Sequence, residues 1–142
     1  MAAVENSLAE CEVLIATAAV ADYRPEDVAA DKIKKSAHAM VIKLIQNPDI
    51  VATVAEGEDR PFTVGFAAET NSLEAYARDK LVRKNLDMIV ANNVATEGTG
   101  FNADDNEGTI YWPGGELALS KTSKANMARQ IIAVIAQRIA GT

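Results

Sequence analysis

The feature that most constrains the fold is an apolar run near the start of the chain. After Glu12 the sequence reads VLIATAAV, from Val13 to Val20, with almost no alternation of apolar and polar residues. A strand with one face in water alternates, whereas a strand that is covered on both faces does not. We therefore expect a strand from Glu12 to Val20 inside a parallel sheet, with helices on both faces.

The same reasoning predicts the other elements of the chain. Further strands are expected at Met40–Ile45, Phe62–Ala67 and Leu86–Ala91, and a terminal hairpin at Thr109–Trp112 and Glu116–Leu119. Helices are expected at Ala2–Ala9, from Asn47 to about Ala55, from Asn71 to Lys84, and from a cap at Ser123 to Ile139. Strands that alternate with helices indicate a largely parallel sheet in one α/β domain, residues 1–142.

Two helix starts carry specific signals. Asn47 is the expected N-cap of its helix, with Pro48 at the first helical position. The last helix has an apolar face, formed by Met127, Ile131, Ile132, Val134, Ile135 and Ile139. Between the fourth strand and the hairpin, the stretch from Asn92 to Asn106 is expected to be a polar loop.

Composition excludes several classes of function. No apolar run approaches the roughly 18 residues of a membrane-spanning helix, so no membrane partner is expected. Cys11 is the only cysteine, which rules out an intrachain disulfide and favours the reducing cytoplasm. His38 is the only histidine and argues against a His-ligated zinc centre. A net charge of -6 argues against nucleic acid as the main partner.

Positive charge nevertheless gathers just beyond the end of the first predicted strand. Lys32, Lys34 and Lys35 follow Asp22 and Pro25 at short range. Ligands of open parallel sheets bind outside the carboxyl ends of the strands, so these lysines are candidates to hold an anion. The ordinary explanation of a lysine run is a solvated face, and Asp22 taken alone fits an ordinary turn acid.

Other strand ends offer weaker candidates. Phe66 ends the third predicted strand, and Asn92 follows the fourth. Asn and Asp side chains at such ends can bind a sugar or a base edge, although an aromatic residue there is more often core than a stacking platform. Lys80 and Lys84 lie one turn apart near a helix C-terminus, where cations also suit the helix dipole.

Two familiar signatures are absent or incomplete. The chain has neither GxGxxG nor GxxxxGK[ST], so a nucleotide phosphate would have to be held by lysines and helix N-termini. Asp104, Asp105 and Glu107 resemble a metal cluster, but their spacing fits no calcium loop, and a polar loop is the better explanation.

In their order along the chain these signals are specific. AAVADYRP, KIKK, NPDI, VGFAAET, ARDKLVRKNLD, IVANN and GFNADDN together resemble the bacterial phosphopantothenoylcysteine synthetase family over essentially the whole chain. The resemblance implies a Rossmann-like, three-layer α/β fold with a mostly parallel sheet, a homodimer and a cytoplasmic enzyme. It also implies a ligase of coenzyme A biosynthesis, which couples 4'-phosphopantothenate to cysteine with CTP and Mg2+ through an acyl-cytidylate. Such ligases are commonly fused to a flavin-dependent decarboxylase domain.

Site residues follow from the resemblance position by position. Lys32 opens the family's KxKK motif and would reach the phosphates from a flap, as the catalytic residue. The remaining nucleotide contacts implied are Ala16, Thr17, Ala18, Asp22, Pro48, Asp49, Ile50, Val51, Phe66, Lys80 and Lys84. No metal ligand is implied.

The resemblance also implies an absence. Family members have a further segment that holds a first strand, a phosphate turn and an asparagine of the cysteine-dependent step, whereas this sequence starts inside the helix before the strand that ends near Ala19. We therefore expect the sheet to lack strands of its middle and the phosphopantothenate site to be incomplete, with CTP binding retained. The sequence alone leaves two other functions open. One is a nicotinamide-dependent oxidoreductase of the same fold, and the other is a non-catalytic binding domain.

Overall fold

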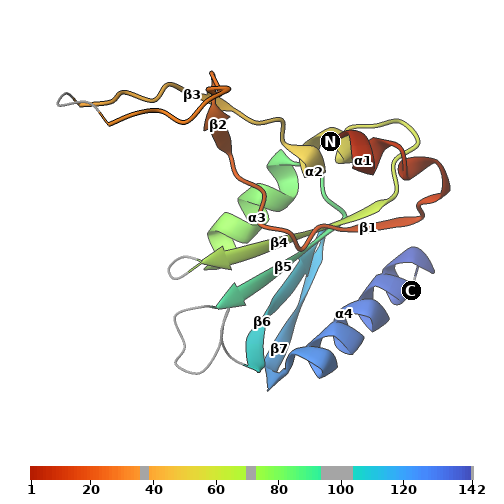
Figure 1. The fold of residues 1–142 in the computed structure, drawn as a ribbon. Helices are drawn as coiled ribbons and strands as arrows, with labels where there is room; N and C mark the ends of the chain where they lie inside the picture. Colours follow the sequence, from red (N-terminus) through yellow and green to blue (C-terminus); the bar gives the residue numbers. More distant parts are fainter. Residues whose placement is uncertain (36–38, 70–72, 94–103, 142) are drawn as a thin grey trace.

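The structure is a computed structural model and describes residues 1–35, 39–69, 73–93 and 104–141 (Figure 1). Its helical elements are α1 (Ala2–Glu5), the short 3-10 helix η1 (Leu8–Glu10), α2 (Ile50–Ala55), α3 (Leu73–Arg83) and α4 (Lys124–Ile139). Its strands are β1 (Val13–Ile15), β2 (Tyr23–Pro25), β3 (Leu44–Gln46), β4 (Phe62–Glu69), β5 (Met88–Asn93), β6 (Asp105–Trp112) and β7 (Gly115–Ser123). None of the helices in these ranges is long and apolar enough to cross a membrane.

Five strands form one continuous sheet in the order β1-β4-β5-β6-β7. β1 pairs with β4 and β4 with β5 in parallel, whereas β6 is antiparallel to both β5 and β7. Within this sheet only β6 therefore runs against the others. The expected α/β fold, with a mostly parallel sheet and a C-terminal antiparallel hairpin, is confirmed.

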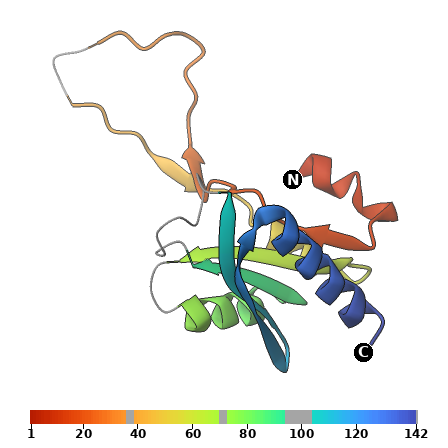
Figure 2. The same cartoon turned by 90° about the horizontal axis from the view of Figure 1, so that it is seen from below.

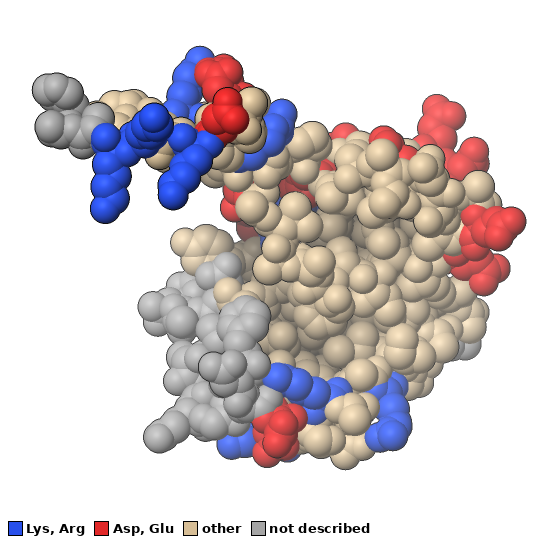
Figure 3. Space-filling view, in the orientation of Figure 1, with Lys and Arg blue, Asp and Glu red and all other residues tan. Residues whose placement is uncertain are grey.

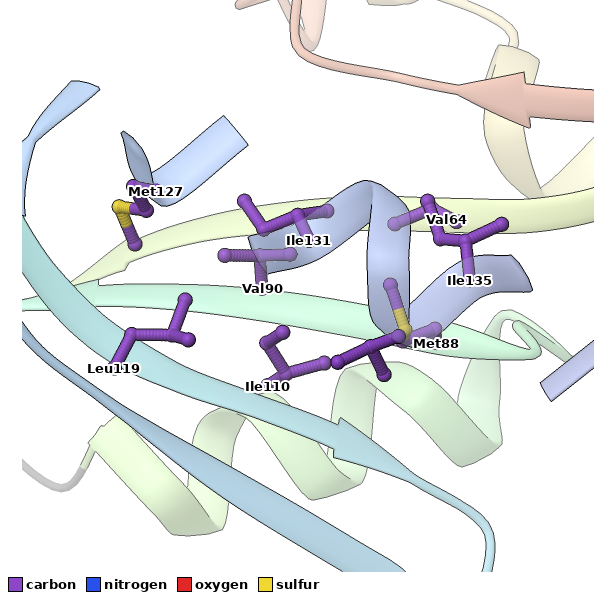
Figure 4. Close-up of a cluster of buried hydrophobic side chains, with 9 residues drawn as sticks. Val64, Met88, Val90, Ile110, Leu119, Met127, Ile131 and Ile135 are labelled. Atoms are coloured by element: carbon purple, nitrogen blue, oxygen red, sulfur yellow. The ribbon is translucent and has the colours of Figure 1, made fainter. Parts of the chain in front are cut away.

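Helices cover both faces of the sheet and give three layers (Figure 1). On one face, α4 packs its buried residues against β4, β5, β6 and β7, as the close-up in Figure 4 shows. On the other face, Ala77 and Leu81 of α3 pack against Ile89 of β5 and Tyr111 of β6, together with Ala55 of α2. Both faces of the central strand β5 are thus apolar, which explains why its sequence does not alternate.

The last helix forms as its sequence predicts. Ser123 is the N-cap, and its hydroxyl accepts a hydrogen bond from the backbone N–H of Asn126 at 3.3 Å. Met127, Ile131, Val134 and Ile135 are buried, one or two turns apart along one stripe. Ile132 and Ile139, also predicted for this face, are each 53% exposed, because the stripe that meets the sheet is narrower than the apolar content of the helix suggests.

The first predicted strand is much shorter than expected. β1 ends at Ile15, and the last backbone bond along it runs from the N–H of Ala16 to the carbonyl of Val64 at 2.9 Å. Residues 17–22 then leave the sheet and are exposed. The small apolar residues that follow β1 line a cleft. The length of the apolar run in the sequence therefore overestimates the length of the buried strand.

A narrow arm projects from the body of the molecule (Figures 1 and 2). Its base is the antiparallel pair of β2 and β3, in which Arg24 lies opposite Ile45. The strand predicted at Met40–Ile45 is therefore displaced to Leu44–Gln46, and its partner at Tyr23–Pro25 was not predicted. Three residues that include a proline are too few to give a strand signal from sequence.

Other boundaries also differ from the sequence prediction, and the helix predicted at Ala2–Ala9 is divided into α1 and η1. The N-cap of α2 is Asp49 rather than Asn47, so Pro48 precedes the cap. β6 begins at Asp105, so Asp105 and Glu107 belong to the hairpin rather than to a loop. His38 and residues 94–103 of the predicted polar loop lie outside the described residues.

Candidate functional site

A cleft of about 400 Å³ opens at the carboxyl ends of the parallel strands. Its walls come from the segment after β1, the start of α2, the ends of β4 and β5, and α3. The residues that line it are Ala16, Thr17, Ala18, Ala19, Val20, Ala21, Asp22, Gln46, Asn47, Pro48, Asp49, Ile50, Val51, Gly65, Phe66, Ala67, Ala68, Lys80, Lys84, Leu86 and Asn92. This is where open parallel sheets bind ligands.

Every residue predicted for the nucleotide site lines this cleft except Lys32. Four separate stretches of chain, around Thr17, Asp49, Phe66 and Lys84, thus come together in one place. Lys32 is exposed on the arm, where Figure 3 shows several Lys and Arg side chains together with acidic ones. In this structure the predicted catalytic lysine does not contribute to the cleft wall, whereas the other predicted contacts do.

Asp49 joins two walls of the cleft. One carboxylate oxygen accepts a hydrogen bond from the backbone N–H of Ala52 at 3.1 Å, which caps α2. The other oxygen lies 2.6 Å from the ammonium nitrogen of Lys84 on the far side. Burial raises the pKa of Asp49, but the hydrogen bonds from Lys84 and Ala52, with the charges of Lys84 and Lys80, outweigh it and hold the pKa below its ordinary value.

Lys80 lies on α3, one turn before Lys84, which directly follows the helix, and Lys80 is also held by the protein. Its ammonium group donates a hydrogen bond to the main-chain oxygen of Phe66 at 2.8 Å. The ring of Phe66 is partly buried and packs against the core cluster under α4. The sequence left open whether Phe66 is core or ligand-facing; the residue contacts the core and lines the cleft as well.

Asn47 ties the arm to the cleft. Its side-chain nitrogen donates to the main-chain oxygen of Ala21 at 2.7 Å, and its side-chain oxygen accepts from Arg24 at 2.8 Å. Its backbone N–H donates to the carbonyl of Asp22 at 2.7 Å. The residue that the sequence predicted as a helix cap therefore fixes the two ends of the arm to each other.

Asn92 is a cleft residue that the predicted site omitted. It lies at the end of β5, between Ala68 of β4 and Gly108 of β6. Its side-chain oxygen is shielded from solvent and has no hydrogen-bond partner among the described residues. The signal in the sequence was its position directly after an apolar strand, which the resemblance did not convert into a ligand contact.

Gly108 explains how β6 can approach Asn92 so closely. A Cβ atom at this glycine would clash with the carbonyl oxygen of Ala91, which belongs to the backbone of the paired strand and so cannot yield as a flexible side chain would. The wall of the cleft at β5 is therefore built on a backbone approach that only glycine allows.

The cleft offers little for a metal ion on its own. Among the described residues there is no group of three or more His, Cys, Asp or Glu side chains able to hold a metal. Asp22 and Asp49 are the acidic residues of the lining, and Asp49 is already bound to Lys84. Mg2+ commonly needs only one or two carboxylates when phosphates supply the other ligands, so Asp22 fits an ion that arrives with a phosphorylated ligand.

Comparisons with known proteins place the chain. Residues 1–139 match the family model described as the DNA/pantothenate metabolism flavoprotein C-terminal domain. The coenzyme A biosynthesis bifunctional protein CoaBC of Vibrio parahaemolyticus is 57% identical over 85% of this chain, and that of Escherichia coli K12 is 46% identical over 96%. The chain spans about a third of these relatives, 31% and 35% of their lengths.

Solved structures agree. The crystal structure of the C-terminal domain of CoaBC superposes with a TM-score of 0.76 and 34% sequence identity, over 99% of this chain and 61% of that one. The DNA/pantothenate metabolism flavoprotein of Streptococcus pneumoniae has a TM-score of 0.72 at 18% identity, which supports the fold alone. These findings confirm the resemblance that the sequence motifs indicated. The chain belongs to the family of the DNA/pantothenate metabolism flavoprotein C-terminal domain.

Proposed function

We propose that this chain supplies the CTP-binding part of a ligase that joins 4'-phosphopantothenate to cysteine in coenzyme A biosynthesis. The observation that carries the proposal is the convergence of the segments around Thr17, Asp49, Phe66 and Lys84 on one cleft at the strand ends. The names of the relatives, coenzyme A biosynthesis bifunctional proteins, support the pathway. Their bifunctional character supports a fusion to a flavin-dependent decarboxylase domain in proteins of this kind.

The charges of the cleft suit the first half-reaction. Attack of the phosphopantothenate carboxylate on the α-phosphorus of CTP forms the acyl-cytidylate and releases pyrophosphate. That step brings several negative charges together, and the ammonium groups of Lys80 and Lys84 lie where they can offset them. Mg2+, held by the phosphates with Asp22 as the available carboxylate, would supply further charge neutralisation there.

The second half-reaction needs a nucleophile for the activated acyl group and an acceptor for its proton. The amine of cysteine attacks the acyl carbon and gives up one proton to solvent, an amide bond forms, and CMP leaves with the electron pair of the broken acyl–oxygen bond. Water would compete with cysteine for the acyl-cytidylate, so exclusion of water from the cleft protects the intermediate.

Lys32 enters this scheme through movement of the arm. The arm is tied to the body at Asn47, whereas Lys32 and its neighbours are exposed beyond the short β2–β3 pair. We propose that the arm closes when triphosphate is bound and brings Lys32 to the phosphates, as catalytic loops do in other enzymes. Its lysines provide the electrostatic attraction for that closure.

The arm also supports the proposed homodimer. Val28, Val41 and Ile42 are 86%, 92% and 61% exposed, which is unusual for apolar residues grouped on one projecting segment. A second copy of the chain is the partner that we propose for this surface. The compartment that we propose for this protein is the cytoplasm, because a single cysteine, Cys11, suits a reducing environment.

Thermal unfolding with CTP, ATP or NADPH, each with Mg2+, tests the nucleotide. We expect CTP to raise the melting temperature most, because ligands stabilise the state that binds them. A rise with NADPH and none with CTP would instead support the oxidoreductase. Incubation with phosphopantothenate, CTP and cysteine then tests chemistry through release of pyrophosphate and CMP. CTP binding without turnover would indicate that the chain binds the nucleotide but does not complete the ligation by itself.

A further inference from the structure

We infer that Asp49 is a positioning residue. Its carboxylate holds the ammonium group of Lys84 in the cleft, so that this ammonium group is already ordered when a nucleoside triphosphate binds. This assigns the acidic side chain a task of its own within the site. It rests on the proposed function only for the identity of the ligand.

The contacts of Asp49 leave its carboxylate little freedom to bind a ligand. One oxygen accepts from the backbone N–H of Ala52 at 3.1 Å and the other lies 2.6 Å from the nitrogen of Lys84. The capping bond fixes the carboxylate to α2, and the ion pair fixes Lys84 to the carboxylate. Asp49 therefore sets the position of a side chain from a different part of the chain, directly after α3.

Lys84 needs such a partner. Its side chain is only 17% exposed, and a largely buried ammonium group is unfavourable unless an acceptor or an opposite charge replaces its lost water. A lysine side chain also has many rotamers, and fixing one of them has an entropic cost. Because the ion pair fixes the rotamer of Lys84 before a ligand binds, binding itself does not have to order this side chain. This is the general advantage of a preorganised site.

The neighbouring lysine shows the same arrangement with a different acceptor. Lys80 donates to the main-chain oxygen of Phe66 at 2.8 Å, so both ammonium groups of the cleft wall are held by the protein. The pair of lysines would repel each other if uncompensated. The charge of Asp49 reduces that repulsion, and the same two lysines help to lower the pKa of this carboxyl.

The test compares two substitutions that remove the same charge. Asp49→Asn keeps an oxygen that can cap α2 but removes the ion pair with Lys84. Asp79→Asn is the matched control, since Asp79 pairs with Arg83 on the same helix and its side chain is 67% exposed. Titration calorimetry with Mg2+–CTP, and with inorganic tripolyphosphate as a base-free probe, measures the affinity of each variant.

Positioning and simple charge predict opposite results. Removal of a negative charge near a triphosphate would by itself tighten binding, whereas loss of positioning weakens it. We expect Asp49→Asn to weaken binding of both probes by about tenfold, with Asp79→Asn near wild type. In a Lys84→Met background, Asp49→Asn should have little further effect. Equal or tighter binding by Asp49→Asn, or additive losses in the double variant, would overturn the inference.

A measurement without ligand separates this inference from the proposed function. In the NMR spectrum of lysine side chains, Lys84 should show restricted motion in wild type and in Asp79→Asn, and the averaged signal of a free lysine in Asp49→Asn. Should CTP fail to bind wild type, the proposed function fails while this readout still decides the role of Asp49. A Lys84 signal that is unchanged by Asp49→Asn refutes that role.

Discussion

The side-chain nitrogen of Asn47 lies 2.7 Å from the main-chain oxygen of Ala21, across the base of the arm. The same side chain accepts a hydrogen bond from Arg24, so one residue holds both ends of the segment that carries the lysines. The base of the arm is therefore fixed at the wall of the cleft, which Asn47 and Ala21 both line.

Asn47→Ala should loosen this base without unfolding the sheet. Removing the side chain leaves the carbonyl of Ala21 and the guanidinium of Arg24 without these partners, for a loss of about 1–2 kcal/mol in the free energy of unfolding. Urea unfolding measures that loss, and hydrogen exchange should show faster exchange in residues 21–26 and 43–47. Asn6→Ala, at an exposed residue of the N-terminal segment, is the control and should change neither.

Lys32→Ala tests the closing arm. We expect the rate of acyl-cytidylate formation to fall by at least about 100-fold, because a cation is lost where phosphate charge develops. Pyrophosphate release in the presence of phosphopantothenate measures this rate. The circular dichroism spectrum and melting temperature should stay those of wild type, since Lys32 is exposed. Lys121→Ala, an equal loss of charge on the exposed part of β7, serves as the comparison. An unchanged rate in Lys32→Ala would remove this lysine from the mechanism.

Val41→Glu tests the proposed dimer. Val41 is 92% exposed on the arm, and a carboxylate buried there between two copies would be strongly unfavourable. Sedimentation should therefore show a dimer for wild type and a monomer for Val41→Glu. Val82→Glu places the same charge on α3, where Val82 is 79% exposed, and should leave the dimer intact. If both variants form dimers, the dimer interface does not include Val41 of the arm.

The ion pair of Asp49 should appear in the pH dependence of stability. Its pKa is lower in the folded state than in the unfolded chain, so its contribution is fully present above the unfolded pKa. That contribution is lost as the pH falls through the lower, folded value. Urea unfolding of wild type and Asp49→Asn should show wild type to be more stable at pH 7, with the difference shrinking toward acid pH. A difference that is constant with pH would contradict the charged pair.

Gly108→Ala tests the close approach of β6 to the cleft wall. The added methyl would meet the carbonyl oxygen of Ala91 at 2.3 Å, so the strands must separate, at about 1–3 kcal/mol of stability. Gly57→Ala is the control, because the nearest atom to its Cβ is 3.4 Å away. Chemical denaturation of the two variants measures the difference, and comparable stability in both would show that β5 and β6 can adjust.

Much of this architecture could be predicted because it depends on burial and local signals. The apolar strands Phe62–Glu69 and Met88–Asn93 and the cap at Ser123 are encoded by residues that are close in sequence. The strand at Tyr23–Pro25 could not be predicted, because it exists only through its pairing with Leu44–Gln46. Asn47 is a residue type that commonly caps helices, yet its side chain donates a hydrogen bond to Ala21, a contact between distant parts of the chain.

The candidate site likewise has features that the sequence could predict and features that it could not. Its residues were identified through the resemblance, and the structure brings all of them but Lys32 to one cleft. The ion pair between Asp49 and Lys84 could not be read from sequence, because it depends on how α2 and α3 are placed on the sheet. The shielded oxygen of Asn92 likewise becomes visible only when the neighbouring strands are in position.

β1 is the first strand of the sheet, and among the described residues only β4 pairs with it. Its outer side presents amide and carbonyl groups of Val13–Ile15 in the geometry of a parallel ladder. An extended polypeptide laid along this side would lengthen the sheet without disturbing any contact of the core. The opposite margin is β7, which among the described residues likewise pairs on one side only, with β6.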